Sequence, residues 1–394
     1  MLDTITNEVK KNVSTGTVDH RIYFDNAATT ALDKEVLEAM MPYMTQHFGN
    51  PSSIYSYGRE TRLAIENARK SVAKILGVKP GTIFFTSGGT ESDNAAIASA
   101  IRDLGCTHII TSAIEHHAVL HTVEHYGHEN HVTISFVALK EDGHVDLQNL
   151  EDQLQQYTAA GKKCLVSLMH ANNEIGVLLP IKKAGEICQR YAAIFHSDCV
   201  QTVGHYPINL SEIYVHFITA AGHKFHGPKG TGMLYVNENV NIKPFIFGGG
   251  QERNMRAGTE NVYGIVGFAK ALEIAMRDYE QHSAYINDIK HYMINRLKAN
   301  FEGICFNCAA DSLYTVLSVC FPKTEKSDFL LMNLDMNHIC ASGGSACSSG
   351  ADAGSHVMKA LNKNEDYMTI RFSFSKYNTK EEVDIVVEKL KELV

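Results

Sequence analysis

Short, mainly apolar runs alternate along the chain with longer segments in which apolar positions recur at helical spacing. The runs cover residues 83–86, 108–111, 164–169, 193–195, 217–221 and 233–236. Runs of this length, bounded by turn residues, are typical of strands buried on both faces, and the segments between them predict helices. This order predicts an α/β fold with a largely parallel sheet covered by helices, whose functional site lies at the carboxyl ends of the strands.

The pattern changes near residue 264, where a helical stretch rich in Ala, Glu, Lys and Met extends over residues 265–297. Strand-like runs at 315–321 and 368–373 and an amphipathic tail at 381–393 follow it and predict a compact α+β unit. We therefore expect a large domain over residues 31–270 and a smaller C-terminal domain over residues 271–394. Residues 1–30 are expected to form an N-terminal segment that packs with the small domain.

Composition and charge narrow the possible classes of protein. The 394 residues are 44% apolar and 20% charged, and the chain has no apolar run of the roughly 18 to 20 residues that cross a bilayer. The net charge of −8 argues against nucleic acid or an anionic membrane as the main partner. Nine scattered cysteines, and acidic residues where a secretory leader would need basic ones, indicate a cytoplasmic protein with reduced thiols.

Two short segments have the residue types of an anion site and of a buried acid. Residues 86–92, Thr-Ser-Gly-Gly-Thr-Glu-Ser, follow an apolar run, and a helix that begins there would offer free N–H groups and a positive dipole end to a phosphate. An ordinary helix cap at Thr90 explains the same residues. Asp198 ends another apolar run, so it is either a buried carboxylate that pairs with a cation or the cap of the next helix.

Lys224 lies between the runs at 217–221 and 233–236, near the rim of the predicted sheet, where an ammonium group is costly unless it is used. A phosphate site, a carboxylate and a lysine are the three groups that pyridoxal phosphate requires for its phosphate, ring nitrogen and aldehyde. A nucleotide loop at residues 227–232 explains fewer of these residues, because it lacks the Gly-Lys-Ser/Thr ending.

Longer blocks of sequence carry a resemblance to a known family. They lie at residues 23–30, 48–53, 86–92, 115–116, 171–176, 198–201, 223–224, 248–253, 256–259 and 342–348. In these blocks and in their order the chain resembles the cysteine desulfurases, fold-type I pyridoxal phosphate enzymes, and specifically the housekeeping group that supplies iron–sulfur cluster assembly. The resemblance implies a large cofactor-binding domain with a mainly parallel seven-stranded sheet and a small α+β domain with a catalytic cysteine loop.

The resemblance also assigns roles around the cofactor. It implies that Lys224 forms the Schiff base, that His116 stacks on the cofactor ring, and that Asp198 pairs with the ring nitrogen. Gln201 would reach the phenolate oxygen. Further cofactor contacts are implied for Gly89, Thr90, Asn173 and His223, and for Thr259 from the second subunit of a homodimer.

The same resemblance places the substrate, L-cysteine, against Asn26, Asn173 and Arg371. A planar guanidinium can hold a carboxylate with two parallel hydrogen bonds, and the apolar neighbours of Arg371 argue against a surface ion pair. Lys224 would move the proton of the substrate Cα, and Asp198 would keep the cofactor ring an electron sink.

Cys347 decides the reaction that we expect. It lies in a run of small residues at 341–351, which favours a loop over a packed core. As a thiolate it would attack the sulfur of the substrate, leaving L-alanine and a persulfide on Cys347. A scaffold protein for iron–sulfur clusters, and other acceptors such as tRNA-thiolation proteins, would then receive the sulfur.

Two other functions remain open at this point. A selenocysteine lyase or another β-eliminating enzyme could use the same fold without a persulfide on Cys347. A non-catalytic subunit that binds partners could also keep the fold. Such a subunit would have no chemical reason to retain Lys224, Asp198, His116, Arg371 and Cys347 together.

One position departs from the family pattern. Ala221 stands where family members carry a phosphate-binding serine, and Thr219, two residues further back, cannot simply replace it. The loss of one hydrogen bond, about 1 kcal/mol, would lower the affinity for the cofactor but leave activity.

Two groups of residues suggest a metal site. Cys305 and Cys308 have the spacing of half a zinc site, but no second pair lies near them in the sequence. His117, His121 and His125 share one face of a predicted helix, and a partly exposed polar face explains them better. We therefore expect reduced thiols and no metal.

Overall fold

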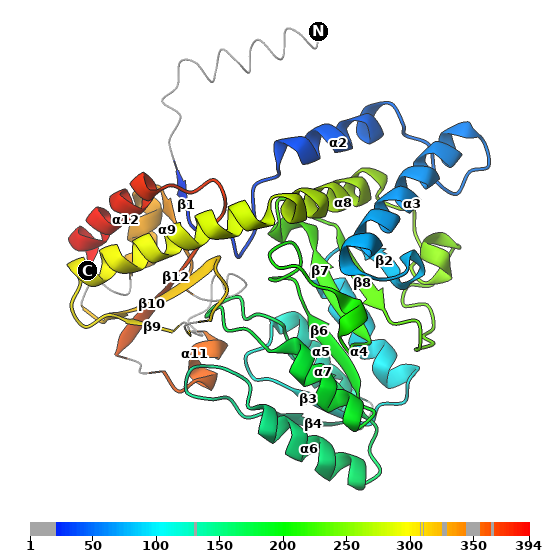
Figure 1. The fold of residues 1–394 in the computed structure, drawn as a ribbon, viewed down its shortest axis with the longest axis horizontal. Helices are drawn as coiled ribbons and strands as arrows, with labels where there is room; N and C mark the ends of the chain where they lie inside the picture. The colour runs from blue at the N-terminus through cyan, green and yellow to red at the C-terminus, as the bar shows by residue number, and fades with distance from the viewer. Residues whose placement is uncertain are drawn as a thin grey trace.

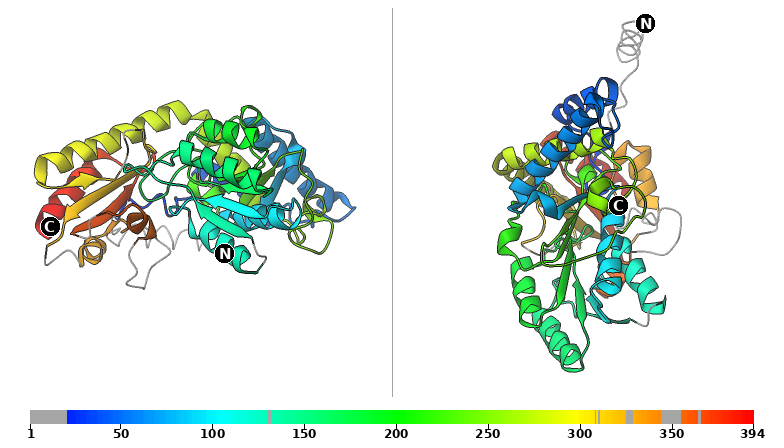
Figure 2. Two further views of the ribbon diagram at one scale, coloured as in Figure 1. Left: turned by 90° about the horizontal axis from the view of Figure 1, so that it is seen from below. Right: turned by 90° about the vertical axis from the view of Figure 1, so that its right-hand side faces the viewer.

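The computed structural model describes residues 21–129, 132–307, 309, 311–324, 329–343, 355–363 and 366–394 of the chain. Within these residues a large and a small lobe are joined by two long helices, α8 (Val262–Arg277) and α9 (Tyr279–Asn300), which follow one another across both lobes (Figure 1, Figure 2). The sequence predicted one helical stretch over residues 265–297. The structure interrupts it at Asp278, whose backbone leaves the helical conformation with φ −106° and ψ 12°.

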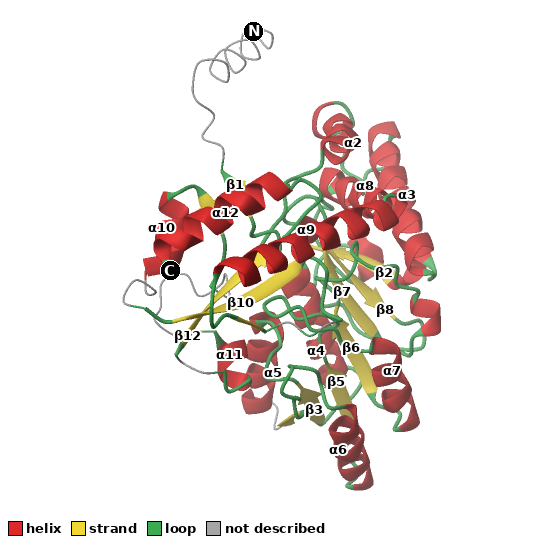
Figure 3. Cartoon of the chain, turned by 60° about the vertical axis from the view of Figure 1, so that its left-hand side comes forward, coloured by secondary structure: helices red, strands yellow, loops and turns green. Residues whose placement is uncertain are grey.

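A seven-stranded sheet forms the centre of the large lobe (Figure 3). Its strands, in spatial order, are β2 (Ile83–Thr86), β8 (Gly232–Val236), β7 (Phe217–Ala221), β6 (Ile194–Asp198), β5 (Cys164–Ser167), β3 (His108–Thr111) and β4 (Thr133–Phe136). Strand β8 runs antiparallel to both of its neighbours, and the other pairs are parallel. The prediction of a mainly parallel seven-stranded sheet is therefore confirmed.

Both faces of this sheet are buried, because alternate side chains along each strand point to opposite sides. In β2, Ile83 and Phe85 belong to the core under one face, whereas Phe84 belongs to the core under the other. Burial on both sides explains why the strands appear in the sequence as uninterrupted apolar runs.

Helices form a layer on each face of the sheet (Figure 3). The first face is covered by α3 (Ser56–Leu76), α6 (Leu147–Ala159), α7 (Ile181–Arg190) and α8, and α2 (Lys34–Thr45) packs on α8. The second face is covered by α4 (Gly89–Arg102) and α5 (His117–Glu129).

The small lobe is built on a three-stranded antiparallel sheet of β12 (Tyr367–Ser373), β10 (Val316–Pro322) and β9 (Cys305–Phe306). Helices α9, α10 (Leu330–Met336) and α12 (Lys380–Leu393) complete its core. A parallel pair of β1 (Ile22–Tyr23) and β11 (Ile339–Cys340) joins the first described residues to this lobe, and α11 (His356–Ala360) lies beyond β11 in sequence. The lobe is thus the α+β unit that the sequence predicted.

A close contact in the large lobe fixes the segment that follows the predicted catalytic lysine. Gly204 has a φ of +82°, and a β-carbon added there would lie 2.5 Å from the side chain of Phe225. Phe225 directly follows Lys224, so this contact holds the backbone of the lysine segment against the turn after β6.

We expect Gly204→Ala to destabilise the protein, because it combines a left-handed backbone, worth about 1–2 kcal/mol, with an overpacked contact, worth about 1–3 kcal/mol. Gly105→Ala is the matched control: its φ is +70°, but no heavy atom lies within 4 Å of the added β-carbon. Scanning calorimetry should show a clearly larger fall in melting temperature for Gly204→Ala. Equal falls would contradict the importance of the Phe225 contact.

Candidate active site

A cavity of about 220 Å³ lies at the carboxyl edge of the sheet. One water needs only about 15 Å³ of such space, so the cavity can hold an organic molecule. Strands β6, β7 and β12 and the first turn of α4 contribute to its walls. Nine residues that the sequence singled out line it: Gly89, Thr90, His116, Asn173, Asp198, Gln201, His223, Lys224 and Arg371.

Helix α4 begins at this cavity without a capping side chain. Its N-cap residue is Gly88, and Gly89 and Thr90 start the first turn. A β-carbon at Gly89 would lie 2.8 Å from the side chain of Val200, so glycine lets the helix start against the cavity wall. The first N–H groups of a helix have no partner within the helix, and here they remain available to an anion. This geometry favours an anion site over an ordinary side-chain cap.

Asp198 ends β6 at the cavity and is almost completely buried. Its Oδ1 accepts a hydrogen bond from the backbone N–H of Val200 at 2.8 Å. Burial, and the nearby carboxylate of Asp93, raise the pKa of Asp198 to about 7, against the lowering influence of the Val200 hydrogen bond and of Lys224. A cation placed beside this carboxylate would favour its ionised form.

Lys224 enters the cavity from the 3-10 helix η3 (Gly222–Lys224), which follows β7 directly. Its Nζ donates hydrogen bonds to the carbonyl oxygens of Ala27 at 2.6 Å and Ala28 at 2.9 Å. Both alanines line the same cavity, so the ammonium group is held at its wall. Gln201, from the turn after β6, donates to the same Ala27 carbonyl at 3.1 Å.

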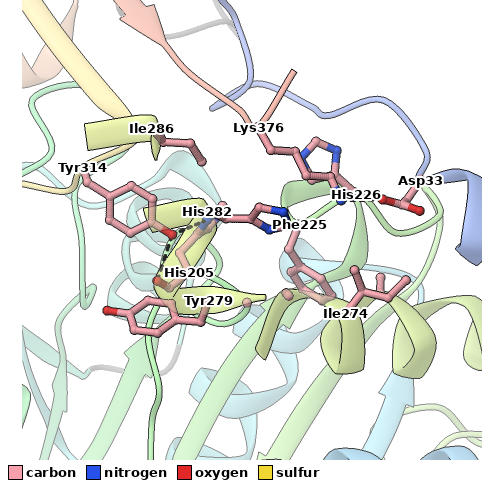
Figure 4. Close-up of a pocket in the computed structure, with 13 residues that line it drawn as sticks. Asp33, His205, Phe225, His226, Ile274, Tyr279, His282, Ile286, Tyr314 and Lys376 are labelled. Atoms are coloured by element: carbon pink, nitrogen blue, oxygen red, sulfur yellow. Dashed lines mark hydrogen bonds and ion pairs between the residues drawn. The ribbon is translucent and has the colours of Figure 1, made fainter. Parts of the chain in front are cut away.

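A smaller cavity of about 40 Å³ is lined by residues that include His205, Phe225 and Tyr314 (Figure 4). In it the hydroxyl of Tyr314 donates to the carbonyl of His205 at 2.9 Å, and Nε2 of His205 lies 3.0 Å from the carbonyl oxygen of Lys224. This cavity has room for only a few waters, and its lining contains none of the predicted site residues. We therefore assign the candidate site to the larger cavity.

Two histidines at the site are uncharged at neutral pH. Burial, with the charge of Lys224 as the next cause, lowers the pKa of His116 and of His223 to about 4. Nδ1 of His116 accepts a hydrogen bond from the N–H of Ala118 at 3.1 Å, which leaves the ring proton on Nε2. Nδ1 of His223 lies 3.2 Å from the hydroxyl of Thr29. A neutral ring of this kind can stack on a planar ligand or donate one hydrogen bond.

Arg371 reaches the cavity from β12 of the small lobe, although it is only 1% exposed. Its Nη2 pairs with Oδ1 of Asp25 at 2.7 Å, and its Nη1 donates to the carbonyl of Asn173 at 2.9 Å. Its Nε is buried and has no hydrogen-bond partner within the described residues. That N–H group is a donor that a ligand carboxylate could use.

Two of the predicted site residues lie elsewhere, and a third cannot be placed. Asn26 does not line the cavity: it is buried, and its side-chain amide donates to the carbonyl of Ser373 at 2.9 Å, an interaction that holds the N-terminal segment to β12. Thr259 lines a separate cavity beside Ser87. Cys347 lies outside the described residues.

Sequence reasoning missed two acidic residues of the site. Asp93 lines the cavity from α4, four residues after Gly89, and this helical spacing could have identified it. Burial raises the pKa of Asp93 to about 8, so it is mainly a neutral acid at neutral pH. Asp25, the partner of Arg371, carried no signal in the sequence, because the two residues meet only through the tertiary fold.

Ala221 also lines the cavity, and the hydroxyl of Thr219 lies 3.3 Å from Nε2 of His196, inside the core. Because Thr219 is fully buried and does not line the cavity, it does not take the place of a serine at 221.

The residues that suggested a metal site do not form one in the described part of the chain, where no three His, Cys, Asp or Glu side chains converge. Cys305 is exposed in β9, and Cys308 lies outside the described residues. The rings of His117 and His121 are stacked with centroids 4.9 Å apart and planes within 6°. No helix among the described residues has the length and apolarity to cross a membrane.

Comparisons with known proteins agree with this architecture. Residues 22–386 match the family model for aminotransferase class V. A cysteine desulfurase IscS of Dictyoglomus turgidum is 42% identical over 95% of this chain and 94% of its own length, and one of Methanosarcina thermophila is 42% identical over 98% and 94%. A solved NifS-like protein superposes with a TM-score of 0.86 at 37% identity, covering 94% of this chain and 98% of its own.

A NifS-like protein from Rickettsia africae superposes with a TM-score of 0.84 at 33% identity, covering 95% and 99% of the two chains. The mainly parallel sheet, the small α+β lobe and the site at the strand ends define a fold-type I enzyme. More particularly, the chain belongs to the aminotransferase class V family and, within it, to the cysteine desulfurases. The resemblance found in the sequence is confirmed.

The raised pKa of Asp198 predicts a pH dependence in the protein without cofactor. The folded state holds a proton that the unfolded state releases between the ordinary pKa of 3.8 and about 7, so the stability that this group contributes is lost as the pH rises through that window. We expect Asp198→Asn to melt at a higher temperature than wild type at about pH 8, with a smaller difference at about pH 5.

The same substitution should weaken binding of pyridoxal phosphate, because an amide cannot neutralise a ring cation. Calorimetry of the cofactor-free protein and a cofactor titration test both effects. A variant that melts below wild type at both pH values would show that the ionised carboxylate stabilises the cofactor-free protein.

Proposed function

We propose that the protein is a pyridoxal phosphate-dependent cysteine desulfurase that converts L-cysteine to L-alanine and carries the sulfur as a persulfide on Cys347. The observation that carries this proposal is the arrangement of the cavity. The uncapped end of α4 offers an anion site, the buried carboxylate of Asp198 lies at the end of β6, and Lys224 enters the same space. These three groups fit the phosphate, the ring nitrogen and the aldehyde of the cofactor, in that order.

In this assignment Gly89, Thr90 and His223 would hold the phosphate, and Gln201 the phenolate oxygen. Pyridoxal phosphate supplies an electron sink that stabilises negative charge on the substrate Cα. Asp198 would keep that sink effective by remaining ionised beside the ring nitrogen. The neutral ring of His116 would stack on the cofactor.

The substrate would be held by its carboxylate and deprotonated at Cα. Arg371 supplies a buried guanidinium, fixed by Asp25 and by the carbonyl of Asn173, and its Nε–H has no hydrogen-bond partner within the described residues. Asn173 also lines the cavity, and its side chain would complete the carboxylate site. Lys224 would carry the Cα proton, because its Nζ already lies at the wall of the cavity.

The thiolate of Cys347 would then take the substrate sulfur. An S–S bond forms as the Cβ–S bond breaks, the electron pair of the broken bond stays with the substrate carbon, and protonation there gives alanine. The persulfide would pass to an iron–sulfur scaffold and to other acceptors such as tRNA-thiolation proteins. The seven cysteines in the described part are free thiols, which suits a reducing compartment such as the cytoplasm.

A homodimer is part of the proposal. A patch of exposed aromatic and apolar side chains covers the loop between α2 and α3 and the segment before η4 (Gln251–Asn254): Phe48 is 74% exposed, Ile54 89% and Phe247 77%. Gln251 donates to the hydroxyl of Ser52 at 3.2 Å and joins the two segments. Such a patch is typical of a subunit interface, and a second copy would bring Thr259 to the site.

We expect the protein, loaded with cofactor and given L-cysteine and a thiol reductant, to release alanine and sulfide in equal amounts. Cys347→Ser should lose both products by on the order of 100-fold or more. Cys305→Ser, which removes an exposed thiol of the small lobe, is the matched control and should keep full activity. Equal alanine formation by Cys347→Ser and wild type would contradict the role of the thiol.

The same pair of proteins separates the rival activity. Selenium release from L-selenocysteine that survives in Cys347→Ser would favour a lyase. A wild-type protein with no Lys224-dependent visible absorption band after incubation with pyridoxal phosphate would exclude both enzymes.

A second experiment tests the dimer. Ile54→Asp should convert the protein to a monomer, because a carboxylate cannot be buried in an apolar interface without a partner. Met336→Asp, at a residue that is 69% exposed on the small lobe, is the matched control and should leave the dimer intact. Light scattering gives both masses, and a wild-type monomer or a dimeric Ile54→Asp would refute this interface.

A further inference from the structure

Glu91 places a negative charge at the helix end to which we assign the cofactor phosphate. It follows Thr90 in the first turn of α4, and its side chain is only 17% exposed. A carboxylate in this position interacts favourably with the helix dipole, but it also repels a second anion at the same end. If the phosphate binds there, the charge of Glu91 must be compensated.

Arg256 supplies that compensation. Its Nε donates to Oε1 of Glu91 at 3.0 Å and its Nη2 to Oε2 at 3.1 Å, so the pair is bidentate. The backbone N–H of Ser87, at 3.1 Å, and its hydroxyl, at 2.5 Å, donate to the same Oε2. Burial by itself would raise the pKa of Glu91, but the Arg256 and Ser87 interactions lower it below its ordinary value. Glu91 is therefore ionised and neutralised by its partner.

The segment that carries Arg256 is held in a strained conformation. Three consecutive residues have left-handed backbones, Glu252 with φ 41°, Arg253 with φ 56° and Asn254 with φ 67°. A left-handed backbone is unfavourable for most L residues, so such a segment persists only where its surroundings hold it.

A buried ion pair provides this support. Glu252 accepts hydrogen bonds from Nη1 and Nη2 of Arg69, each at 2.8 Å, and both side chains are 2% exposed. Oε2 of Glu252 also accepts from the backbone N–H of Phe85 at 2.9 Å, which ties the segment to the edge strand β2. These contacts connect strand β2 and the segment that carries Arg256.

We propose that Arg256 is a positioning residue of the cofactor site, which neutralises Glu91 and so keeps the N-terminus of α4 able to bind a phosphate group. This inference rests on the proposed function, because it takes pyridoxal phosphate to be the ligand. It concerns only the charge near the phosphate, so it predicts no change in how the protein binds the ring or the aldehyde of the ligand. A merely structural tie between Arg256 and Glu91 would affect every ligand of the cavity alike.

The test compares pyridoxal phosphate with pyridoxal, which lacks the phosphate, in titrations of the cofactor-free protein followed by the visible absorption of the lysine-bound ligand. Arg256→Gln should weaken binding of pyridoxal phosphate by about tenfold, because it leaves an unpaired carboxylate beside the phosphate. Its affinity for pyridoxal should stay within about twofold of wild type. Glu91→Gln should bind pyridoxal phosphate at least as tightly as wild type, since it removes a negative charge.

The double variant Arg256→Gln/Glu91→Gln should return to within about threefold of the wild-type affinity, because no carboxylate is then left to neutralise. The proposal is overturned if Arg256→Gln weakens both ligands alike, if Glu91→Gln also weakens binding of the phosphate form, or if the double variant is not restored. If Arg256→Gln does not fold, the affinity of Glu91→Gln for pyridoxal phosphate tests the proposal by itself: weaker binding than wild type overturns it.

The outcomes also separate this inference from the proposed function. If wild type gives a Lys224-dependent band with pyridoxal phosphate and all variants bind equally well, only the role of Arg256 is wrong. If wild type gives no such band with either ligand, the proposed function fails and this inference fails with it.

Discussion

A cluster of buried carboxyl groups in and beside the cavity is the constraint on which the site depends. Asp93, Glu115 and Asp198 are all buried, and burial raises the pKa of each. Asp93 raises the pKa of Asp198, and both raise that of Glu115, so a single added positive charge at Asp198 relieves several unfavourable interactions at once. The N-terminus of α4, which carries the positive end of a helix dipole, lines the same cavity. The cavity thus has a polarity that suits a ligand with both a cationic ring and a phosphate, as in the proposed function.

The sheet topology creates this polarity. Strands β5, β6 and β7 are parallel, so the turns that follow them meet at one edge, where Asp198 and Lys224 lie. Strand β8 then returns antiparallel between β7 and β2, and its first residue, Gly232, pairs with Thr86 at the end of β2. A β-carbon at Gly232 would come within 2.7 Å of the Gly88 backbone, so this pairing depends on glycine where α4 begins. The N-terminus of α4 and the lysine segment at the cavity are therefore fixed by one set of strand pairings.

Much of this could be predicted from the sequence, because the information was local. Strands buried on both faces leave uninterrupted apolar runs, and the residues that chemistry requires at their ends, Asp198 and Lys224, follow those runs directly. Features that depend on tertiary contacts could not be predicted. The pairing of Arg371 with Asp25 joins residues far apart in the chain, and Asn26 proved to hold the N-terminal segment to β12 instead of lining the cavity. The left-handed backbone at Glu252 could not be predicted, because the residue is not a glycine and the conformation is maintained by a buried arginine of α3 that is distant in sequence.

The spacing between the two residues that would act on the substrate depends on both lobes. Lys224 belongs to the large lobe, but its backbone is supported from behind by His205, which in turn contacts Tyr314 just before β10. Arg371 lies on β12, which pairs antiparallel with β10, and Phe374 at the end of that strand donates to the carbonyl of Thr315. The pair of β10 and β12 is therefore linked to Lys224 through Tyr314 and His205, and it also carries Arg371. Because Lys224 lies on the large lobe and Arg371 on the small lobe, the distance between the residue proposed to carry the proton and the residue proposed to bind the carboxylate depends on the junction of the lobes rather than on either loop alone.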